Sequence, residues 1–269
     1  MRKVKVAILF TAGTNCDEET IYAFKLAGAF AENVHINILK KKKHLLNQYQ
    51  ILVIPGGFTY GDYISAGKIL ANELKYIICD AINEFIRQGK LILGICNGFQ
   101  VLAKAGILPG FSNHRQKKSY FSKQTITLTT NDSNRFECRW IYLKPNPKSP
   151  CVFTKGMSDI ALIPVAHAEG KVIFDKKETL SKLIKNEQIV FTYTDKSGKK
   201  AGYPYNPNGS IADIAGICDA SGRILGMMPH PERACRIYQY PNWHILPKNK
   251  EPDGLKIFVN AVNYVKANF

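Results

Sequence analysis

A short segment around residue 96 constrains the fold more than any other part of the chain. An apolar run, Leu91–Ile95, leads into Gly94-Ile95-Cys96-Asn97-Gly98, and a helix-compatible stretch follows over Phe99–Lys104. This order predicts a buried strand, a tight turn and a helix, with a cysteine at the turn. The glycines beside the turn tolerate strained dihedral angles and allow close backbone packing. The segment therefore has the form of a nucleophile elbow, Gly-x-nucleophile-x-Gly, with cysteine in place of serine.

The predicted elbow places the side chain of Cys96 at the N-terminus of the helix that follows. Unpaired N–H groups and the helix dipole favour an anion there, so we expect Cys96 to react as a thiolate nucleophile. A small buried cysteine with a purely structural role is the alternative. The flanking glycines and the change from strand to helix favour the nucleophile.

The first half of the chain alternates short apolar runs with longer amphipathic ones, which is typical of a parallel α/β sheet. We predict a flavodoxin-like, doubly wound sheet, in which ligands sit at the carboxyl ends of the strands. The expected strands are Val4–Phe10, Val34–Leu39, Gln50–Ile54 and Leu91–Ile95, and the expected helices are Asp17–Ala29 and one or two within Ser65–Gln88.

The second half contains strand-like segments separated by turn signals, and it ends in an amphipathic helix. We interpret these strands as antiparallel additions packed on the first sheet, which makes the sheet mixed. These segments are Thr125–Thr130, Trp140–Leu143, Pro164–Ile173, Ile189–Thr194 and Ile211–Ile217. We expect Leu225–Pro229 to be a last core strand and Gly254–Lys266 to be the final helix. We expect a single domain over residues 1–269, with an extended tail segment at 237–253 that serves as an interface or a lid.

The chain is basic, with a formal net charge of +16. A surplus of this size can mark a nucleic-acid binder, but most of it is lysine and no RNA-binding aromatic motif or zinc finger accompanies it. Two lysine runs, Lys40–Lys43 and Lys117–Lys118, are best interpreted as solvated surface. We therefore expect no nucleic-acid partner, and an acidic protein or a phosphorylated substrate remains the secondary interpretation of the charge.

Cysteine usage and hydropathy indicate a cytoplasmic protein. The seven cysteines are scattered, with no Cys-x-x-Cys pair and no His/Cys cluster of zinc spacing, so we expect a reducing compartment and no metal. No apolar run approaches the roughly 20 residues of a membrane span. The apolar N-terminal run is interrupted by Lys5, and we interpret it as a first strand rather than a signal peptide.

A cysteine nucleophile usually needs a base that is held by a third group. His230 follows an apolar run directly, and Pro229 and Pro231 keep its backbone extended. In an extended backbone His230 and Glu232 point to the same side, so the carboxylate can orient the imidazole as in a catalytic triad. His167 with Glu169 is the rival pair. Because it lies in the antiparallel region, we place it at the rim of the site or in a structural role.

Acyl chemistry also needs hydrogen-bond donors for the oxyanion. The backbone N–H of Asn97, directly after the nucleophile, is one natural donor. The second is expected from the strand-end loop that contains Gly57, where glycine lets the backbone approach a substrate carbonyl. A mere tight turn is the alternative interpretation of that loop.

These segments resemble the triad-type, class I glutamine amidotransferases, which combine a Gly-x-Cys-x-Gly elbow, an upstream Pro-Gly-Gly loop and a late His-Pro-Glu. Further segments are similar to one branch of the family, the glutaminase subunits of phosphoribosylformylglycinamidine synthase in purine synthesis. The resemblance runs from Val4 to about Ala267. The segments that carry it are Gly13–Asp17, Pro55–Asp62, Asn131–Trp140, Pro164–Gly170, Asn206–Ser210, Ile214–Cys218 and Met228–Arg233.

The resemblance implies a glutaminase that forms a glutamyl thioester on Cys96. It also implies that His230, oriented by Glu232, carries the proton and that Gln100 helps to hold glutamine. It also implies that the ammonia passes to a separate synthetase subunit, with a small third subunit as a further partner. ATP and magnesium are expected on the synthetase, because this chain has no phosphate-binding loop of the Gly-x-x-x-x-Gly-Lys-Ser/Thr type and no cofactor of its own. A stand-alone cysteine hydrolase and an amidotransferase subunit of another pathway remain the alternatives.

Overall fold

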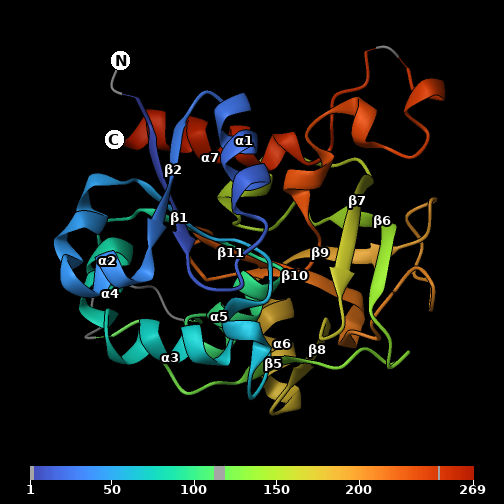
Figure 1. Cartoon of the computed structure of the whole chain (residues 1–269). Coiled ribbons are helices and arrows are strands. Elements are labelled where there is room, and N and C mark those ends of the chain that lie inside the picture. The colour runs from blue at the N-terminus through green and yellow to red at the C-terminus, as the bar shows by residue number, and fades with distance from the viewer. Residues whose placement is uncertain (1–2, 112–118, 248) are drawn as a thin grey trace.

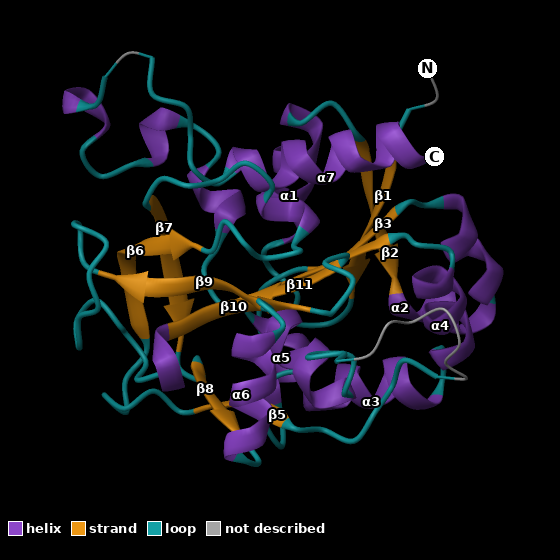
Figure 2. Ribbon diagram, turned by 180° about the vertical axis from the view of Figure 1, so that it is seen from behind, coloured by secondary structure: helices purple, strands orange, loops and turns teal. Residues whose placement is uncertain are grey.

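The computed structural model describes residues 3–111, 119–247 and 249–269, and it is built around one large mixed sheet with helices on both faces (Figures 1 and 2). The order of strands in the nine-stranded sheet is β2-β1-β3-β4-β11-β10-β9-β6-β7. The strands are β1 Lys5–Phe10, β2 Phe30–His35, β3 Ile51–Ile54, β4 Leu91–Ile95, β5 Ile126–Thr129, β6 Glu137–Pro145, β7 Ala161–His167, β8 Lys171–Phe174, β9 Ile189–Thr194, β10 Ile214–Cys218 and β11 Ile224–Met227.

Helices cover the sheet from above and below in the orientation of Figure 1, as a doubly wound fold requires. Helices α1 and α7 lie together on one face, where the rings of Phe24 and Phe258 meet edge to face at 5.0 Å. Helices α3, α4 and α5 lie on the other face. The helices are α1 Asp17–Leu26, α2 Ile36–Lys41, α3 Lys68–Tyr76, α4 Cys79–Arg87, α5 Asn97–Ala105, α6 Lys177–Lys185 and α7 Leu255–Asn268.

The predicted fold class is confirmed, with a parallel core followed by antiparallel strands. Strands β2, β1, β3, β4 and β11 run parallel, and each further pair from β11 to β7 is antiparallel. The core strands β3, β4 and β11 are buried throughout, as expected of parallel strands covered on both faces. The later strands are antiparallel additions, as expected, and all but β5 and β8 extend the first sheet and make it mixed. Those two form a separate antiparallel pair.

Two expectations about single elements were wrong. Val34–Leu39 is not a strand, because β2 ends at His35 and α2 begins at Ile36. In that helix Ile36 and Leu39, three residues apart, face the core, whereas Ile38 is 47% exposed. The segment Pro164–Ile173 contains a turn, and it contributes to two strands, β7 and β8, in different sheets.

The strand directions bring distant parts of the sequence to one edge of the sheet. The loops after β3, β4 and β11 leave from the same edge because these strands are parallel. The four strand pairs from β11 to β7 are all antiparallel, so the strand direction reverses four times and β7 runs in the same direction as β11. The carboxyl end of β7 therefore also lies at this edge. Residues near 57, 96, 167 and 230 are thereby gathered in one place.

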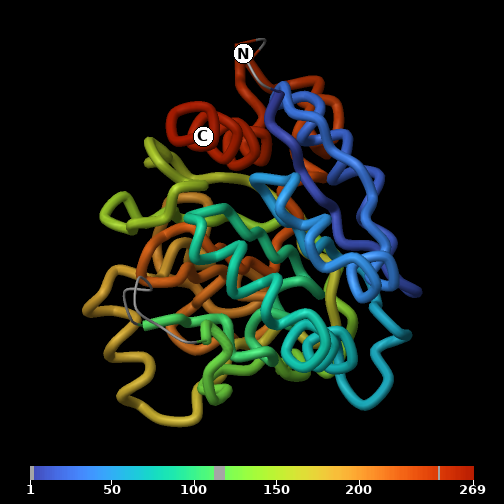
Figure 3. The backbone as a smooth tube through the Cα atoms, turned by 90° about the vertical axis from the view of Figure 1, so that its left-hand side faces the viewer, coloured from blue at the N-terminus to red at the C-terminus, as the bar shows by residue number. Residues whose placement is uncertain are grey.

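The described residues of the segment 237–253, which are 237–247 and 249–253, lie outside the sheet, in orange and red at the upper right of Figure 1. Its Tyr240 is buried, and the ring packs at a tilt against Trp140 with the centroids 4.9 Å apart, whereas Trp243 and Ile245 are 54% and 71% exposed. Figure 3 shows that α7, in red, returns to the end of the molecule that holds the blue first strand. The role of the segment as an interface or a lid stays a prediction, as does the single domain over residues 1–269.

The lysine run at residues 40–43 lies at the surface, as expected. Lys41, Lys42 and Lys43 are exposed, and Lys40 forms an ion pair with Glu73. The second run, Lys117–Lys118, lies outside the described residues. None of the described helices is long and apolar enough to cross a membrane.

Candidate active site

The predicted elbow is present, and Cys96 is its apex. β4 ends at Ile95 and α5 begins at Asn97, so Cys96 is the N-cap residue, with φ 50° and ψ −106°. A positive φ is strained for a residue that carries a Cβ, and strain of this kind concentrates at functional sites. The amide of Cys96 donates to the carbonyl of Met227 at 2.8 Å, which fixes the turn on the neighbouring strand. The thiol is buried, and its sulfur lies 3.6 Å from the carbonyl oxygen of Ala166.

Both glycines of the elbow are required by packing. A Cβ on Gly98 would lie 1.8 Å from the carbonyl oxygen of Ile54, and a Cβ on Gly94 would lie 2.7 Å from the carbonyl oxygen of Gly98. Helix α5 therefore starts in direct backbone contact with strand β3. This close approach turns the helix N-terminus toward the loop that follows β3.

His230 and Glu232 form the buried pair that the sequence predicts. The Nδ1 atom of His230 lies 2.6 Å from Oε1 of Glu232, and the two side chains are 2% and 0% exposed. The amide of His230 donates to the carbonyl of Pro164, so strand β7 holds this loop in place. The Nε2 atom of His230 is buried and has no hydrogen-bond partner among the described residues.

The electrostatics of His230 favour the imidazolium. Burial by itself would lower the pKa of His230, but the attraction of the Glu232 carboxylate and then of the Cys96 sulfur raises the pKa well above its ordinary value. The site thus holds a nucleophile candidate, Cys96, whose charge acts on the imidazole of His230, and a carboxylate that contacts Nδ1 of the same imidazole.

His167 lines the pocket of Cys96 and is bonded within the protein, so the choice between a place at the rim and a structural role stays a prediction. Its Nδ1 atom lies 3.1 Å from Oδ1 of Asn131, and burial followed by the charge of His230 lowers its pKa to about 3. A group with this pKa stays neutral at physiological pH. Glu169 is not its partner, because that carboxylate lies 3.8 Å from the ammonium of Lys104.

The proposed oxyanion loop lies against the elbow. Gly57 has φ 134°, and a Cβ there would lie 2.8 Å from the amide nitrogen of Asn15, so only glycine fits. The side chain of Asn97 joins the loop to the elbow, because its Oδ1 accepts from the Thr59 hydroxyl at 2.6 Å. Gly57 and Cys96 line the same pocket. The roles of the Gly57 and Asn97 amides as oxyanion donors stay predictions.

Gln100 also lines this pocket, but its polar atoms are engaged within the protein. Its Nε2 donates to the carbonyl of Glu169 at 2.6 Å, and its Oε1 accepts from Nδ2 of Asn97 at 2.9 Å. The side chain is therefore held firmly at the wall of the pocket. Its predicted contact with glutamine requires one of these bonds to be exchanged or shared.

The sequence did not assign Cys16 or Asp62 to the site, and it paired Glu169 with His167. Cys16 is buried beside the imidazole, with its sulfur 4.0 Å from Nδ1 of His230 and 3.2 Å from Nη2 of Arg233, and burial raises the pKa of its thiol. The acidic pair Asp62 and Glu169 lines the pocket of Cys96. The one signal in the sequence was that these residues fall within the motifs that carry the family resemblance.

A metal ion could bind here only if the contact between His230 and Glu232 were broken. In the described part of the chain, one group of potential ligands was found, Cys16, His230 and Glu232, whose donor atoms lie within 4.8 Å of one another. The Arg233 guanidinium beside the Cys16 sulfur disfavours a further cation there. The absence of a metal from the chemistry stays a prediction.

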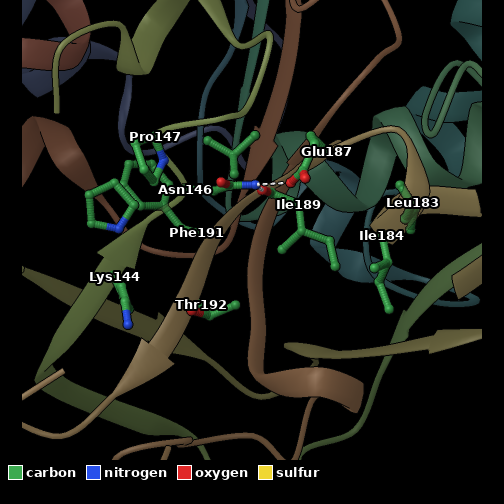
Figure 4. A pocket seen from close by; sticks show the side chains of 11 residues that line it. Lys144, Asn146, Pro147, Leu183, Ile184, Glu187, Ile189, Phe191 and Thr192 are labelled. Carbon is green, nitrogen blue, oxygen red and sulfur yellow. Dashed lines mark hydrogen bonds between the residues drawn. The ribbon is translucent and has the colours of Figure 1, made fainter. Parts of the chain in front are cut away.

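The pocket at Cys96 is small, about 50 Å³, whereas sites for small molecules are typically about 300–1,000 Å³. A larger cavity of about 300 Å³ lies between β6, β9 and α6, and Figure 4 shows its apolar lining, with Asn146 hydrogen-bonded to Glu187. None of the predicted site residues lines that cavity. Because predicted site residues line the small pocket and none lines the larger cavity, we identify the small pocket as the candidate active site. The small pocket must widen to admit a substrate.

Comparison with known proteins identifies the family. Residues 3–265 match the model of the CobB/CobQ-like glutamine amidotransferase domain, and the chain belongs to this family. It is 52% identical over 267 residues to the phosphoribosylformylglycinamidine synthase subunit PurQ of Dehalococcoides mccartyi, with 99% of each chain covered. It is 46% identical to the subunit of the same name from Archaeoglobus fulgidus, with 98% of each covered. A solved structure titled PurLQS from Thermotoga maritima matches with a TM-score of 0.72 and 29% identity, covering 98% of this chain and 100% of the other.

Proposed function

We propose that the chain is the glutaminase subunit of a phosphoribosylformylglycinamidine synthase in purine synthesis. It hydrolyses glutamine to glutamate and ammonia, and it hands the ammonia to a synthetase subunit. The observation that supports this most is the strained elbow of Cys96 beside the buried His230–Glu232 pair, in a chain whose relatives of that name match over their whole length.

The reaction begins with attack of the Cys96 sulfur on the side-chain amide carbon of glutamine. The amides of Gly57 and Asn97 donate to the oxyanion that forms. His230, charged and oriented by Glu232, gives its proton to the leaving nitrogen, which departs as ammonia and leaves a glutamyl thioester on Cys96. His230 then takes a proton from a water that attacks the thioester, and glutamate leaves.

The ammonia is used by the partner, which binds ATP, magnesium and formylglycinamide ribonucleotide. Ammonia that escapes is diluted and protonated by water, so a glutaminase of this kind works best when it is idle until docked. The Cys96 pocket of about 50 Å³ fits an idle state. The small third subunit completes the complex, and seven free cysteines suit a reducing, cytoplasmic compartment.

Reconstitution with a synthetase and a small subunit from a related complex tests this proposal. We expect weak ammonia release by the isolated chain and a rise of ~100-fold with partner, ribonucleotide and nucleotide present. Such a rise needs about 2.7 kcal/mol of differential binding to the competent state. Full turnover by the isolated chain, unchanged by any synthetase, would instead favour a stand-alone cysteine hydrolase. Activation only by a synthetase of guanylate or anthranilate synthesis would move the chain to another pathway.

A further inference from the structure

The buried pair of His230 and Glu232 has a further neighbour, the thiol of Cys16, which the proposed reaction does not use. Cys16 precedes α1 in the loop after β1 and is 1% exposed. Its sulfur lies 4.0 Å from Nδ1 of His230, and one polar atom from each of the three side chains lies within 4.8 Å of the other two. A Cβ on Gly56 would lie 2.7 Å from the imidazole and 3.0 Å from the sulfur, so the backbone packs directly against both side chains.

Hydrogen bonds hold the sulfur of Cys16 as a neutral thiol. The thiol donates to Oδ1 of Asn15 at 3.1 Å, and the sulfur accepts from Nη2 of Arg233 at 3.2 Å. Burial is the largest influence on this thiol and raises its pKa. A buried, neutral thiol is a poor nucleophile, so the part that Cys16 plays must come from its contacts rather than from its reactivity.

Arg233 is the charged group that Cys16 contacts. Its Nε donates to Oε1 of Glu19 at 3.0 Å, while its Nη2 donates to the sulfur. Glu232 is the preceding residue and attracts the guanidinium, but within the described residues the two form no ion pair. Oε2 of Glu232 is buried and has no hydrogen-bond partner in this part of the chain. A guanidinium would satisfy that oxygen well, so a specific contact is needed to keep it away.

A guanidinium paired with Glu232 would weaken His230 as a proton carrier. Burial lowers the pKa of His230, and the attraction of Glu232 is the largest effect that raises it. A cation bound to the same carboxylate would offset this attraction and lower the pKa. The other titratable groups around the imidazole are Cys96 of the elbow, Cys16 of the loop after β1 and the neutral His167 of β7. Arg233 is the cation placed to compete for the carboxylate.

We propose that Cys16 is a positioning residue, whose sulfur keeps the guanidinium of Arg233 away from the carboxylate of Glu232. The carboxylate then acts on His230 without competition, and the guanidinium stays paired with Glu19. This inference rests on the proposed function. It gives Cys16 a part in the reaction that acts through the base pair and forms no bond to the substrate.

The test follows the alkaline limb of the kcat/KM profile for glutamine, where the imidazolium of His230 loses its proton, in the chain reconstituted with the synthetase and small subunit of a related complex. Cys16→Ala removes an acceptor of Arg233, so the limb should move to lower pH by about 1–2 units, the size of shift that a close charge produces. Cys16→Ser keeps a donor and an acceptor and should retain most of the original profile. Cys151→Ala removes another buried thiol, between β6 and β7, and as the matched control should leave the profile unchanged.

A second substitution separates competition from packing. In the double variant Cys16→Ala/Arg233→Met the competing cation is gone, although the space left by the sulfur remains. The alkaline limb should therefore return to its original position. Arg233→Met alone should not move the limb to lower pH.

Thermal unfolding shows which variants fold. If Cys16→Ala does not, Cys16→Val, which fills the space without accepting from Arg233, takes its place with the same expectation. An unmoved limb would overturn the inference. A limb that moves but is not restored by Arg233→Met would overturn it too, because Cys16 would then act only by filling space. Failure of the unmodified chain to hydrolyse glutamine in any complex would count against the proposed function instead.

Discussion

The Glu232→Gln substitution tests the contact through which the Glu232 carboxylate orients the His230 imidazole. The carboxylate lies 2.6 Å from Nδ1 of His230, and both side chains are at most 2% exposed, so water does not screen the interaction. A hydrogen bond to a charged group contributes about 1.5–3 kcal/mol, which corresponds to a roughly 10- to 150-fold loss of kcat. Glutamine keeps an oxygen that can accept from Nδ1–H, so part of the geometry survives. His230→Ala removes the proton carrier itself and should cost more, about 10²–10⁴-fold.

The effects of Glu232→Gln on kinetics and stability should also depend on pH. The pKa of His230 is raised in the folded protein, so its protonated form stabilises the fold fully below pH of about 6.5, and this stabilisation is lost as pH rises through the folded pKa. In Glu232→Gln the pKa of His230 should fall. The alkaline limb of the kcat/KM profile should therefore move to lower pH, and the loss of thermal stability should be largest in acid. Steady-state kinetics and unfolding measured across pH provide the assay. An unchanged alkaline limb, or a larger loss than that of His230→Ala, would refute the reasoning.

Three further substitutions separate the parts of the site. His167→Ala should reduce kcat less than His230→Ala, because His167 is neutral and bonded to Asn131; steady-state glutaminase kinetics decide, and the opposite order would exchange their roles. Gly57→Pro should abolish both residual and partner-stimulated ammonia release, since proline cannot adopt φ 134°, and retained stimulation would remove Gly57 from the oxyanion loop. Gly98→Ala should lower the free energy of unfolding by about 1–3 kcal/mol in denaturant titration, because its Cβ meets the Ile54 carbonyl; unchanged stability would contradict the packing described.

The sequence predicted the elements in which local pattern and tertiary environment agree. Residues 91–98 specify their own strand and turn, and the buried strand β4 has the predicted bounds. The His230–Glu232 contact also follows from local spacing, because two residues in an extended backbone face the same side. The error at Val34–Leu39 arose because Val34, Ile36 and Ile38 alternate as in a strand. In the folded protein Leu39 is buried and Ile38 is exposed, because tertiary packing decides which face of the helix is covered.

The acidic wall of the pocket could not be predicted from local pattern. Asp62, Lys104 and Glu169 come from a loop, a helix and a turn that meet only when β3, β4 and β7 end at one edge of the sheet. The position of β7 depends on four successive antiparallel pairings, whose order the turn signals do not specify. Cys16 reaches His230 in the same way, from the loop after β1.

The identity of the nucleophile is the central claim, and covalent labelling tests it most directly. The chain is incubated with a diazo-ketone analogue of glutamine, digested, and searched by mass spectrometry for the modified cysteine among all seven. The account predicts label on Cys96 alone, with protection by glutamine and no label in Cys96→Ser, which should remain folded but inactive. Label on Cys16, which is buried beside His230, or on Cys218 would contradict it.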